Sequence, residues 1–473
     1  MQQPCAAVPP PPSRDTIPSW RPSTALLVLL AAGALPRLWN LAAYPMEMGF
    51  DAWGNWDYIA MLLGQWRLPA AGEGWSTAHP PFFYFLAAAV GRLTGVTDRV
   101  ALSHLVVALC GLLGLASIAA VALYVRRSGP RAARASLLAA ALLLFLPVHV
   151  YMSAMLGEEV LASALVTFAL VGLAAELQRP EGERSSAARP LVLGVVAGLA
   201  LLTKLSAAPA IAAATAVLAL EGPCRGWKRS LASAAAFAGA AALAGGWFYL
   251  RNLLENVEAY PHGLAVHALM FDMPPGSRTV ADYFRITPDA FRASEAMDAG
   301  LLHSVWGGTW ASIWFDTHRH FLPLHPTRGL ELFARLLLVL GLVPAAAFAT
   351  GLVGGAKRAV LDASGPDRLL VGTTVLTLAG YVAFTWANPW YACVKGSYLL
   401  PLVAPYAIYA ATTLDAWMGA SRGRTAAVLG ALALLSLVAS VTFSYNALFV
   451  KQMEYPGTPG EAPSPPRDRP SGT

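Results

Sequence analysis

Residues 24–60 read TALLVLLAAGALPRLWNLAAYPMEMGFDAWGNWDYIA, an apolar run followed by a stretch that holds two aspartates and several aromatic residues. A run of about 20 apolar residues is typical of a transmembrane helix. Asp51 and Asp57 then lie just beyond the end of this span. The stretch therefore predicts a membrane helix that leads into a polar loop at the membrane surface.

The composition of the whole chain fits the same interpretation. The 473 residues are 56% hydrophobic and only 13% charged, and the mean hydropathy is +0.52. A soluble domain carries about 25% charged residues, and the short alternating segments of a membrane β-barrel are not evident. We predict an all-α polytopic membrane protein with about 11 transmembrane helices. The apolar runs cover 24–43, 100–125, 135–150, 158–177, 190–203, 206–220, 230–250, 329–353, 368–387, 398–418 and 425–448.

The positive charges predict the orientation of these spans. Short loops that connect the runs are rich in Arg and Lys, which favours the cytoplasmic side. The chain then divides into a disordered cytoplasmic N-terminus (1–22), a transmembrane domain (23–450) and a disordered Pro-rich tail (451–473). The outer side carries two long loops, 44–99 and 251–328. We interpret the net charge of +6 as this loop bias rather than as a nucleic-acid patch.

The first run could also be taken for a signal peptide, but no small-x-small cleavage site precedes the next loop, which favours an uncleaved anchor. The four cysteines contain no CxxC pair, so neither a disulfide framework nor a structural zinc site is expected.

The apolar stretch from Leu191 to Leu220 is too long for one span, and basic residues flank both of its ends. If both flanks are cytoplasmic, the stretch forms a tight hairpin with Lys204 near its outer tip. In the first outer loop, Asp51 to Leu63 has the pattern of an amphipathic helix lying in the membrane interface, with Trp53 and Tyr58 on its apolar face.

Several charged residues from different segments are predicted at the same outer depth. Ionisable groups at the ends of apolar spans are costly and often functional. The charged residues predicted at this depth are Asp51 in the first loop, Glu158 and Glu159 at the start of the fourth span, Lys204 at the hairpin tip, Arg251 after the seventh span, and Lys395 in the last outer turn. Five segments that converge on one face indicate a site rather than a single structural ion pair.

The mixture of charges suggests the chemistry. Carboxylates can act as a general base or hold a divalent metal, and Lys and Arg suit a phosphate. A site that faces outward has no supply of nucleotide sugars, so a lipid phosphate is the expected anion. The pattern points to a polyprenyl-phosphate-linked donor whose lipid tail lies between the spans.

The motifs and their order resemble glycosyltransferase family 39-like proteins of the GT-C superfamily, which include protein O-mannosyltransferases and the enzymes that add aminoarabinose to lipid A. The similarity covers roughly residues 24–450. It rests on FDAWGNWDYIAMLLGQWRLPAAGEGWSTAHPPFFYFLAA from Phe50, MLGEEV, GLALLTK at Gly198–Lys204, YLRN at Tyr249–Asn252 and GSYLLPLVAPYAIYAATTL from Gly396.

The resemblance implies inverting transfer of a sugar from a polyprenyl-phosphate donor to an acceptor hydroxyl, at the outer face of the cytoplasmic membrane. Asp51 would be the general base, with a pKa raised by partial desolvation. Acidic support for a metal or the acceptor would come from Glu158 or Glu159, with Asp57 as a further acidic residue. The donor phosphate would be held by His79, Lys204, Arg251 and Lys395.

Two positions depart from the family pattern. Ala52 stands where relatives have a glutamate, which puts a bound divalent metal in doubt, so no cofactor is assigned. Ser397 stands where relatives often carry arginine, and Lys395 is the expected substitute.

Two further features remain open to more than one interpretation. His262 and His267, and likewise His318 and His320, favour loop or acceptor recognition over metal binding, because no further ligand accompanies them. WGGTWASIW at Trp306–Trp314 suits either a sugar-stacking platform or an interfacial anchor.

Two alternative functions also remain open, a transporter of lipid-linked sugars or phospholipids and a non-catalytic relative. A transporter would need charges at the bilayer midplane rather than at one face. The sequence names neither the sugar nor the acceptor, which could be a lipid, a polysaccharide or a protein.

Overall fold

The computed structural model describes residues 23–129, 132–179, 187–221, 226–256, 258–261, 271, 273–322, 328–445 and 447–448. The segments 1–22 and 451–473, and the pair His262 and His267, lie outside these residues, so the predictions for them are untested. The predicted all-α class is confirmed: in the described ranges the only β-type pairing is an isolated bridge between Pro275 and Trp390.

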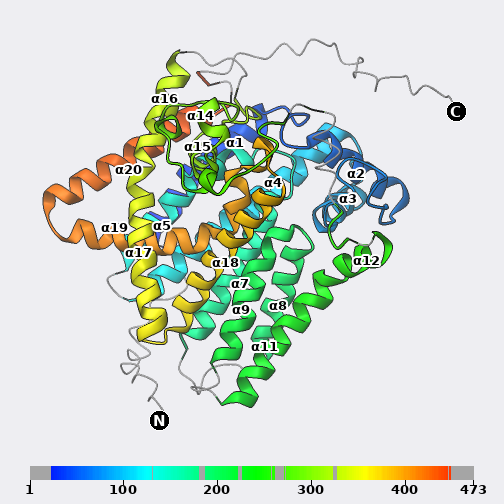
Figure 1. Cartoon of the computed structure of the whole chain (residues 1–473), viewed down its shortest axis with the longest axis horizontal. Helices are drawn as coiled ribbons and strands as arrows, with labels where there is room; N and C mark the ends of the chain where they lie inside the picture. The colour runs from blue at the N-terminus through cyan, green and yellow to red at the C-terminus, as the bar shows by residue number, and fades with distance from the viewer. Residues whose placement is uncertain are drawn as a thin grey trace.

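The helices are named in chain order (Figure 1). The bounds of the helices are α1 (Thr24–Ala43), α2 (Ala52–Gln65), α3 (Phe82–Thr94), α4 (Arg99–Arg127), α5 (Ala133–Leu144), α6 (Pro147–Met152), α7 (Glu159–Leu177), α8 (Ala188–Leu201), η3 (Leu205–Ala207), α9 (Ala208–Leu220), α11 (Trp227–Ala241), a π turn η4 (Ala242–Gly246), α12 (Trp247–Asn256), η5 (Val280–Tyr283), η6 (Pro288–Phe291), α14 (Ala299–Leu302), α15 (Val305–Trp314), α16 (Arg328–Leu340), α17 (Leu342–Leu361), α18 (Gly365–Ala387), η7 (Tyr391–Cys393), η8 (Gly396–Leu402), α19 (Val403–Gly419) and α20 (Arg422–Thr442).

Every apolar run that the sequence shows falls on a helix. In the described part of the chain, eight helical segments are long and apolar enough to cross a membrane. The runs at 135–150, 190–203 and 206–220 contain shorter apolar helices. The chain is therefore a multi-pass membrane protein, and the number of eleven spans stays a prediction.

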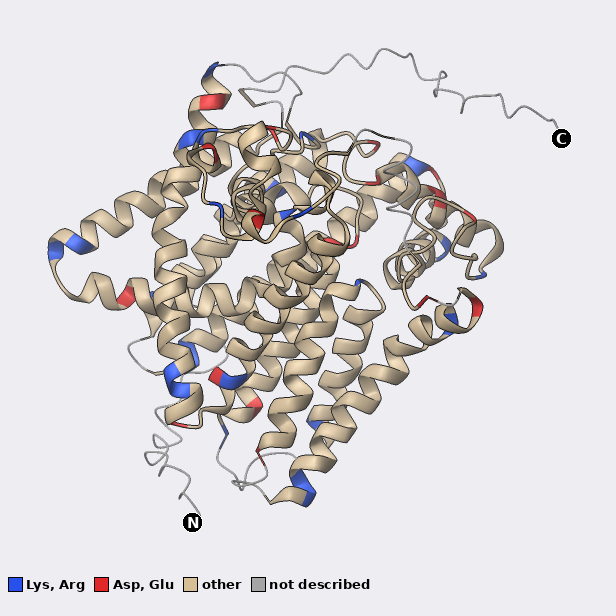
Figure 2. Ribbon diagram, viewed as in Figure 1, with Lys and Arg blue, Asp and Glu red and all other residues tan. Residues whose placement is uncertain are grey.

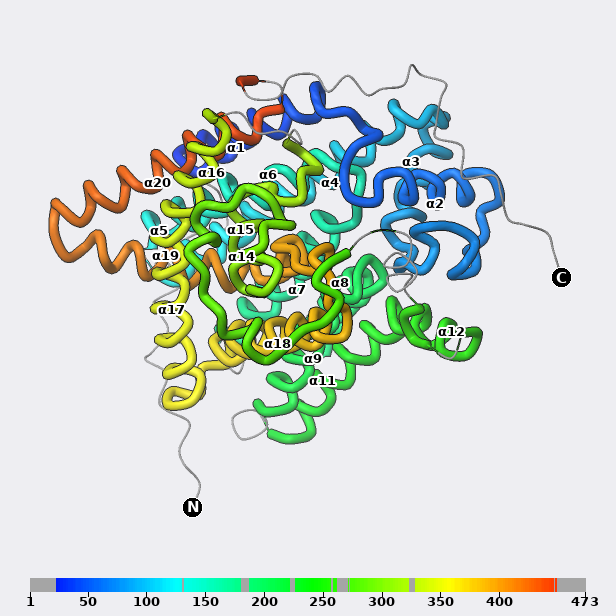
Figure 3. Tube along the Cα trace, turned by 45° about the horizontal axis from the view of Figure 1, so that its top comes forward, coloured from blue at the N-terminus to red at the C-terminus, as the bar shows by residue number. Residues whose placement is uncertain are grey.

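The long helices pack as a bundle around α7, which contacts α4, α8 and α18 (Figures 1 and 3). Lys, Arg, Asp and Glu gather at helix ends and in loops, and the middle parts of the long helices carry few of them (Figure 2). The end of the bundle that carries α2, α3 and α15 is called the site end below. The backbone N–H of Phe82, at the start of α3, donates to the carbonyl of Leu202 after α8, which joins α3 to the α8–η3 turn.

Close contact between α8 and α11 fixes the position of that turn. Gly194 and Gly198 face α11 with the spacing of a small-xxx-small motif, which lets two membrane helices approach closely. A Cβ atom on Gly198 would lie 2.6 Å from the carbonyl oxygen of Ala241. The predicted hairpin is confirmed: α8 ends at Leu201, η3 begins at Leu205, and Lys204 lies between them.

Polar contacts also join helices at the opposite end of the bundle. Arg358 of α17 donates two hydrogen bonds to Asp367 of α18, at 2.7 and 2.9 Å, and the hydroxyl of Tyr409 donates to the same carboxylate. Arg134 pairs with Asp415 across α5 and α19. These ion pairs connect neighbouring helices far from the site end.

The aromatic segment Trp306–Trp314 forms α15, which packs against neighbouring helices. Trp314 is 3% exposed, and the helix contacts η8, α16 and α6. The interpretation of this segment as an interfacial anchor does not hold for Trp314, because its ring packs inside the protein.

Candidate functional site

Asp51 precedes α2 in a left-handed backbone conformation, with φ 53° and ψ 21°. An aspartate before a helix usually has extended backbone and caps the free N–H groups of the first turn. The Asp51 side chain makes no such capping bond. Asp51 is an exposed residue, and its carboxylate is free to accept a hydrogen bond from outside the helix.

One partner of Asp51 is Trp75, in the loop between α2 and α3. The indole N–H of Trp75 donates to Oδ1 of Asp51 at 2.9 Å. The loop can approach this closely because residue 54 of α2 is glycine: a Cβ atom there would lie 2.6 Å from the Trp75 ring. The hydrogen bond orients the carboxylate and leaves its second oxygen available.

The second group in the site is a pair of carboxylates with a lysine between them. Glu158 and Glu159 begin α7, where the helix dipole favours negative charge. The ammonium group of Lys204 donates to Glu158 at 2.8 Å and to Glu159 at 2.9 Å. Burial lowers the pKa of Lys204, but the two carboxylates raise it more, so that the net pKa is well above the ordinary value.

His79 connects this pair to α2 and α3. Nδ1 of His79 lies 3.1 Å from the Tyr84 hydroxyl, and that hydroxyl donates to Oδ1 of Asn55 at 2.9 Å. The Tyr84 proton is then in use, so Nδ1 of His79 carries the proton that joins the two residues. Nδ1 also lies 3.8 Å from Oε1 of Glu158.

Lys395 approaches from the last turn of the site end. Its ammonium nitrogen lies 4.1 Å from the centre of the Phe50 ring and 5.8 Å from that of Tyr398. Lys204 lies 5.6 Å from the same Tyr398 ring, so this tyrosine links the two cations. Within the described residues no hydrogen bond or ion pair holds the Lys395 ammonium, which makes it the uncompensated cation of the site.

Two histidines pack on the same Phe50 ring. The ring of His320 lies 3.9 Å from Phe50, centre to centre, and that of His318 lies 5.8 Å away and stacks on Tyr391. Burial first and the charge of Lys395 second lower the pKa of His318 to about 3 and that of His320 to about 4. Both imidazoles are therefore neutral at pH 7.

The neighbours of Asp51 set its protonation state. Although Asp51 is partly exposed, the protein atoms around its carboxylate desolvate it and raise its pKa, but Lys395, His79 and the Trp75 hydrogen bond lower that pKa more. The net pKa lies below the ordinary value, so the expectation that desolvation raises it is wrong for the protein without substrate. Asp51 is an ionised carboxylate that is ready to accept a proton.

Two of the predicted site residues do not join this cluster. Asp57 lies on the exposed face of α2, where its charge acts on Arg99. Arg251 of α12 pairs with Glu255 at 2.9 Å and donates weakly to the carbonyl of Pro69. No contact among the described residues connects Arg251 to Asp51 or to the carboxylate pair.

The predicted amphipathic helix is present as α2, but its apolar face is divided. Tyr58 and Leu62 are buried, and the Tyr58 ring stacks on Tyr84 of α3 at 4.1 Å. Trp53 is exposed and carries the Arg99 guanidinium 3.7 Å above its ring. One face of α2 therefore packs on α3, and Trp53 lies on the exposed face, beside Arg99.

The residues at the start of α7 do not fit a divalent metal. The Lys204 ammonium already contacts both carboxylates, and Ala52 supplies no ligand. Across the described ranges, no three His, Cys, Asp or Glu side chains are grouped so that they could hold a metal ion.

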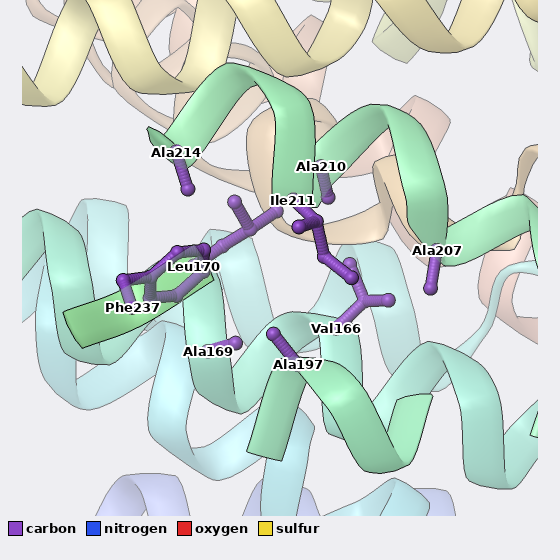
Figure 4. Close-up of a pocket in the computed structure, with 9 residues that line it drawn as sticks. All are labelled: Val166, Ala169, Leu170, Ala197, Ala207, Ala210, Ile211, Ala214 and Phe237. Carbon is purple, nitrogen blue, oxygen red and sulfur yellow. The ribbon is translucent and has the colours of Figure 1, made fainter. Parts of the chain in front are cut away.

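An apolar cavity lies on the other side of the Lys204 turn, between α7, α8, α9 and α11 (Figure 4). Only nonpolar side chains line it, among them Ala207, Ala210 and Phe237. It can bind neither a phosphate nor a polar sugar, so the polar cluster above it is the candidate site.

The comparisons with known proteins come from sequence and from structure. The family described as dolichyl-phosphate-mannose-protein mannosyltransferase matches residues 78–268, which is less than half of the chain. This range includes His79, the carboxylate pair and Lys204. No curated protein sequence matches significantly.

Several solved structures match over most of the chain. The oligosaccharyltransferase of Archaeoglobus fulgidus, tethered with an acceptor peptide, has 17% identity and a TM-score of 0.52 over 89% of this chain and 55% of its own. The same enzyme in complex with zinc and sulfate has a TM-score of 0.51, with 17% identity over 89% and 53%. ArnT from Cupriavidus metallidurans, bound to undecaprenyl phosphate, has 17% identity and a TM-score of 0.50 over 89% and 76%.

These likenesses establish the fold. The chain spans about half the length of the archaeal oligosaccharyltransferase structures. The likeness covers 89% of this chain and agrees with the polytopic helical architecture that the sequence predicted. The protein is a multi-pass membrane protein with the fold of the archaeal oligosaccharyltransferase and ArnT structures.

Proposed function

We propose that the protein is a glycosyltransferase that moves a sugar from a polyprenyl-phosphate donor to an acceptor hydroxyl at the membrane surface. One observation carries the proposal. The carboxylate of Asp51 accepts a hydrogen bond from Trp75 at 2.9 Å. The Lys395 ammonium lies 4.1 Å from the ring centre of Phe50, the residue before Asp51, and its charge lowers the pKa of Asp51. A base and a phosphate-binding cation side by side are what this transfer requires.

The reaction follows from the two roles. Asp51 accepts the proton of the acceptor hydroxyl, and the acceptor oxygen forms a bond to the anomeric carbon of the sugar. The bond from that carbon to the lipid phosphate breaks, and its electron pair stays on the phosphate oxygen. Attack from the face opposite the leaving group inverts the anomeric configuration. Trp75 holds the carboxylate in place through its hydrogen bond.

The negative charge that develops on the leaving phosphate needs a cation at hand. Lys395 suits this role because no acidic partner holds it among the described residues. Lys204 is less suited, since two carboxylates already accept its hydrogen bonds. His79 lies beside the carboxylate pair, with Nδ1 3.8 Å from Glu158.

The same charges couple donor binding to base strength. Lys395 lowers the pKa of Asp51 in the free protein. A bound phosphate offsets that positive charge, so the pKa of Asp51 rises when the donor is present. A carboxylate with a higher pKa is a stronger base, and desolvation by the donor acts in the same direction.

The comparisons support the substrate class. One structural neighbour is bound to undecaprenyl phosphate and another is tethered with an acceptor peptide. For this chain we infer a polyprenyl-phosphate sugar as donor and a lipid, polysaccharide or protein hydroxyl as acceptor. The positive charge of the connecting loops supports a site that faces outward from the cytoplasmic membrane.

The experiment that tests the proposal supplies purified protein in nanodiscs with a panel of polyprenyl-phosphate sugars and candidate acceptors. Release of lipid phosphate together with a glycosylated product is the expected result. The anomeric configuration of the product, determined by NMR, tests inversion. Donor binding without turnover across the whole panel would favour the non-catalytic or transport alternatives.

A further inference from the structure

Helix α20 is followed by the segment 443–445, which packs against the end of α1. Phe443 is 0% exposed and Tyr445 is 2% exposed. Buried backbone N–H and C=O groups outside a helix need hydrogen-bond partners. The segment is therefore expected to be held by specific contacts.

The end of α1 supplies the partners of this backbone. The buried Asn40 amide donates to the carbonyl of Phe443 at 2.7 Å, and its oxygen accepts from the N–H of Tyr445 at 2.8 Å. The indole N–H of Trp39 donates to the carbonyl of Tyr445 at 2.6 Å. Two neighbouring side chains of α1 thus satisfy three backbone groups and fix the segment 443–445 in one register.

The Tyr445 ring contacts two chain segments that are far apart in the sequence. It packs edge-on against Tyr44 at 5.2 Å and against Phe321 at 5.6 Å, centre to centre. Those two rings stack on each other at 5.1 Å. The Tyr445 hydroxyl lies 3.8 Å from the sulfur of Met48. One aromatic ring therefore joins the segment 44–48 to the chain around Phe321.

Both of these segments lead directly to the candidate site. The first continues to Phe50 and Asp51. In the second, the carbonyl of His320 accepts a hydrogen bond from the Tyr44 hydroxyl at 2.7 Å. The His320 ring lies 3.9 Å from that of Phe50. Contacts therefore run without a gap from the end of α20 to the residue before the proposed base.

We propose that Tyr445 is a positioning residue, which holds Asp51 and His320 in place from the end of α20 without touching the substrate. Asp51 needs such support, because its left-handed backbone is strained and persists only where the surrounding structure holds it. The inference rests on the proposed function for its effect on sugar transfer, but its main test does not measure transfer.

Both segments carry hydrogen-bonded amide groups that can report how firmly they are held. The N–H of Met48 donates to the carbonyl of Pro45. The N–H groups of Phe321 and Leu322 donate to the buried Asp316 carboxylate, at 2.7 and 2.8 Å. Exchange of such groups with solvent requires local opening, so the exchange rate measures the local stability of each segment.

Hydrogen–deuterium exchange in nanodiscs compares the wild type with Tyr445→Ala, Tyr445→Phe and Tyr406→Ala. Tyr406 of α19 packs instead on Phe348 of α17 at 5.7 Å, so Tyr406→Ala controls for the general loss of a packed ring. We expect Tyr445→Ala to speed exchange in the segments 44–51 and 316–322 roughly tenfold or more, and Tyr406→Ala to leave both as in the wild type. Tyr445→Phe keeps the ring contacts and should match the wild type.

Two results would overturn the proposal. One is equal exchange in Tyr445→Ala and Tyr406→Ala across both segments, because Tyr445 would then act only as one more packed ring. The other is exchange in Tyr445→Phe as fast as in Tyr445→Ala, since packing of the ring would then not be the cause. If Tyr445→Ala does not fold, Tyr445→Leu and Tyr406→Leu are compared in the same way.

Activity separates this inference from the proposed function. Where the wild type transfers sugar, Tyr445→Ala should lower kcat by up to about a hundredfold, the cost of a misplacement of about 1 Å. The acid limb of kcat/KM should also move to higher pH, because a displaced Asp51 loses the charges that lower its pKa. Absence of transfer with every donor would contradict the proposed function, yet the exchange comparison would still decide the role of Tyr445.

Discussion

The left-handed backbone of Asp51 leaves its carboxylate without a capping bond to the first turn of α2, and the neighbouring charges keep that carboxylate ionised. Non-glycine residues rarely adopt this conformation, although Asp and Asn tolerate it better than others. Such strain, of order 1–2 kcal/mol, persists where the surrounding structure holds it. Here two contacts favour the strained conformation of Asp51. Trp75 donates a hydrogen bond to its carboxylate, and the positive charge of Lys395 stabilises the ionised form.

Lys395→Met should weaken donor binding and change the pH dependence. Loss of a charged contact to phosphate, about 1.5–3 kcal/mol, corresponds to a roughly ten- to hundredfold higher KM. Because Lys395 lowers the pKa of Asp51, its removal raises that pKa and moves the acid limb of kcat/KM to higher pH. Kinetics across pH measure both effects. Lys357→Met, exposed at the opposite end, is the control, and an unmoved acid limb in Lys395→Met would argue against the coupling.

Trp75→Phe should raise the pKa of Asp51, as Lys395→Met does, but by a smaller amount. The variant keeps an aromatic ring and loses the N–H that donates to Asp51. The pKa of Asp51 then rises, since this hydrogen bond lowers it, and kcat falls because the carboxylate is less well oriented. Trp66→Phe serves as the matched control, because Trp66 contacts Arg92 and Phe85 rather than the site. Equal losses in both variants would mean that Trp75 acts only through packing.

At the scale of the elements, the site depends on a hairpin that a helix contact places. Helices α8 and α11 touch through Gly194 and Gly198, and the Lys204 turn follows directly after α8. In a membrane, close packing of this kind supplies much of the attraction between helices, because lipid tails are as apolar as the side chains. The position of Lys204 therefore depends on residues that carry no charge.

Gly198→Val should destabilise the protein by about 1–3 kcal/mol, the usual cost of overpacking, because its side chain would collide with the Ala241 carbonyl. It should also reduce transfer, since the Lys204 turn moves with α8. Gly239→Val, on α11, has open space around its Cβ and is the matched control. Thermal unfolding in detergent compares the two. A Gly198→Val protein as stable as the control would show that the helices can separate without cost.

At the scale of the whole molecule, the sequence predicted the architecture well because membrane spans have a strong local signal. Each apolar run is helical, although runs such as 329–353 are divided between two helices. Lys204 lies in the turn between two helices, as the basic residues on both flanks of that stretch predicted. The structure places Asp51, His79, Lys204, Lys395 and the carboxylate pair in one region, and their functional roles stay a prediction.

The sequence failed where the answer depended on side-chain direction. Asp57 lies on α2, six residues after Asp51, and only the burial of Tyr58 and Leu62 on the other face of the helix shows that Asp57 faces outward. Trp75, Tyr84 and Asn55 belong to the quoted motifs, but their hydrogen bonds join different segments and leave no periodic signal. The sign of the pKa shift at Asp51 required knowing which charges lie around it.

The orientation in the membrane gives a prediction for the whole chain. In a variant without native cysteines, Gly72→Cys lies in the loop before α3 and Lys357→Cys near the end of α17, at opposite ends of the bundle (Figure 1). A membrane-impermeant maleimide added to intact cells should label the first and not the second. The reverse pattern would place the site on the cytoplasmic face and remove the argument for a lipid-linked donor.

The most direct test of the central claim is sugar transfer by three proteins in nanodiscs: the wild type, Asp51→Asn and Asp57→Asn. Asparagine keeps the shape of the side chain and tolerates the left-handed backbone, but it is not a base. Loss of a general base costs roughly a hundred- to ten-thousandfold in rate, so Asp51→Asn should lose transfer to that extent with unchanged folding. Asp57→Asn should match the wild type, because Asp57 lies on the exposed face of α2. Full activity in Asp51→Asn would contradict the account.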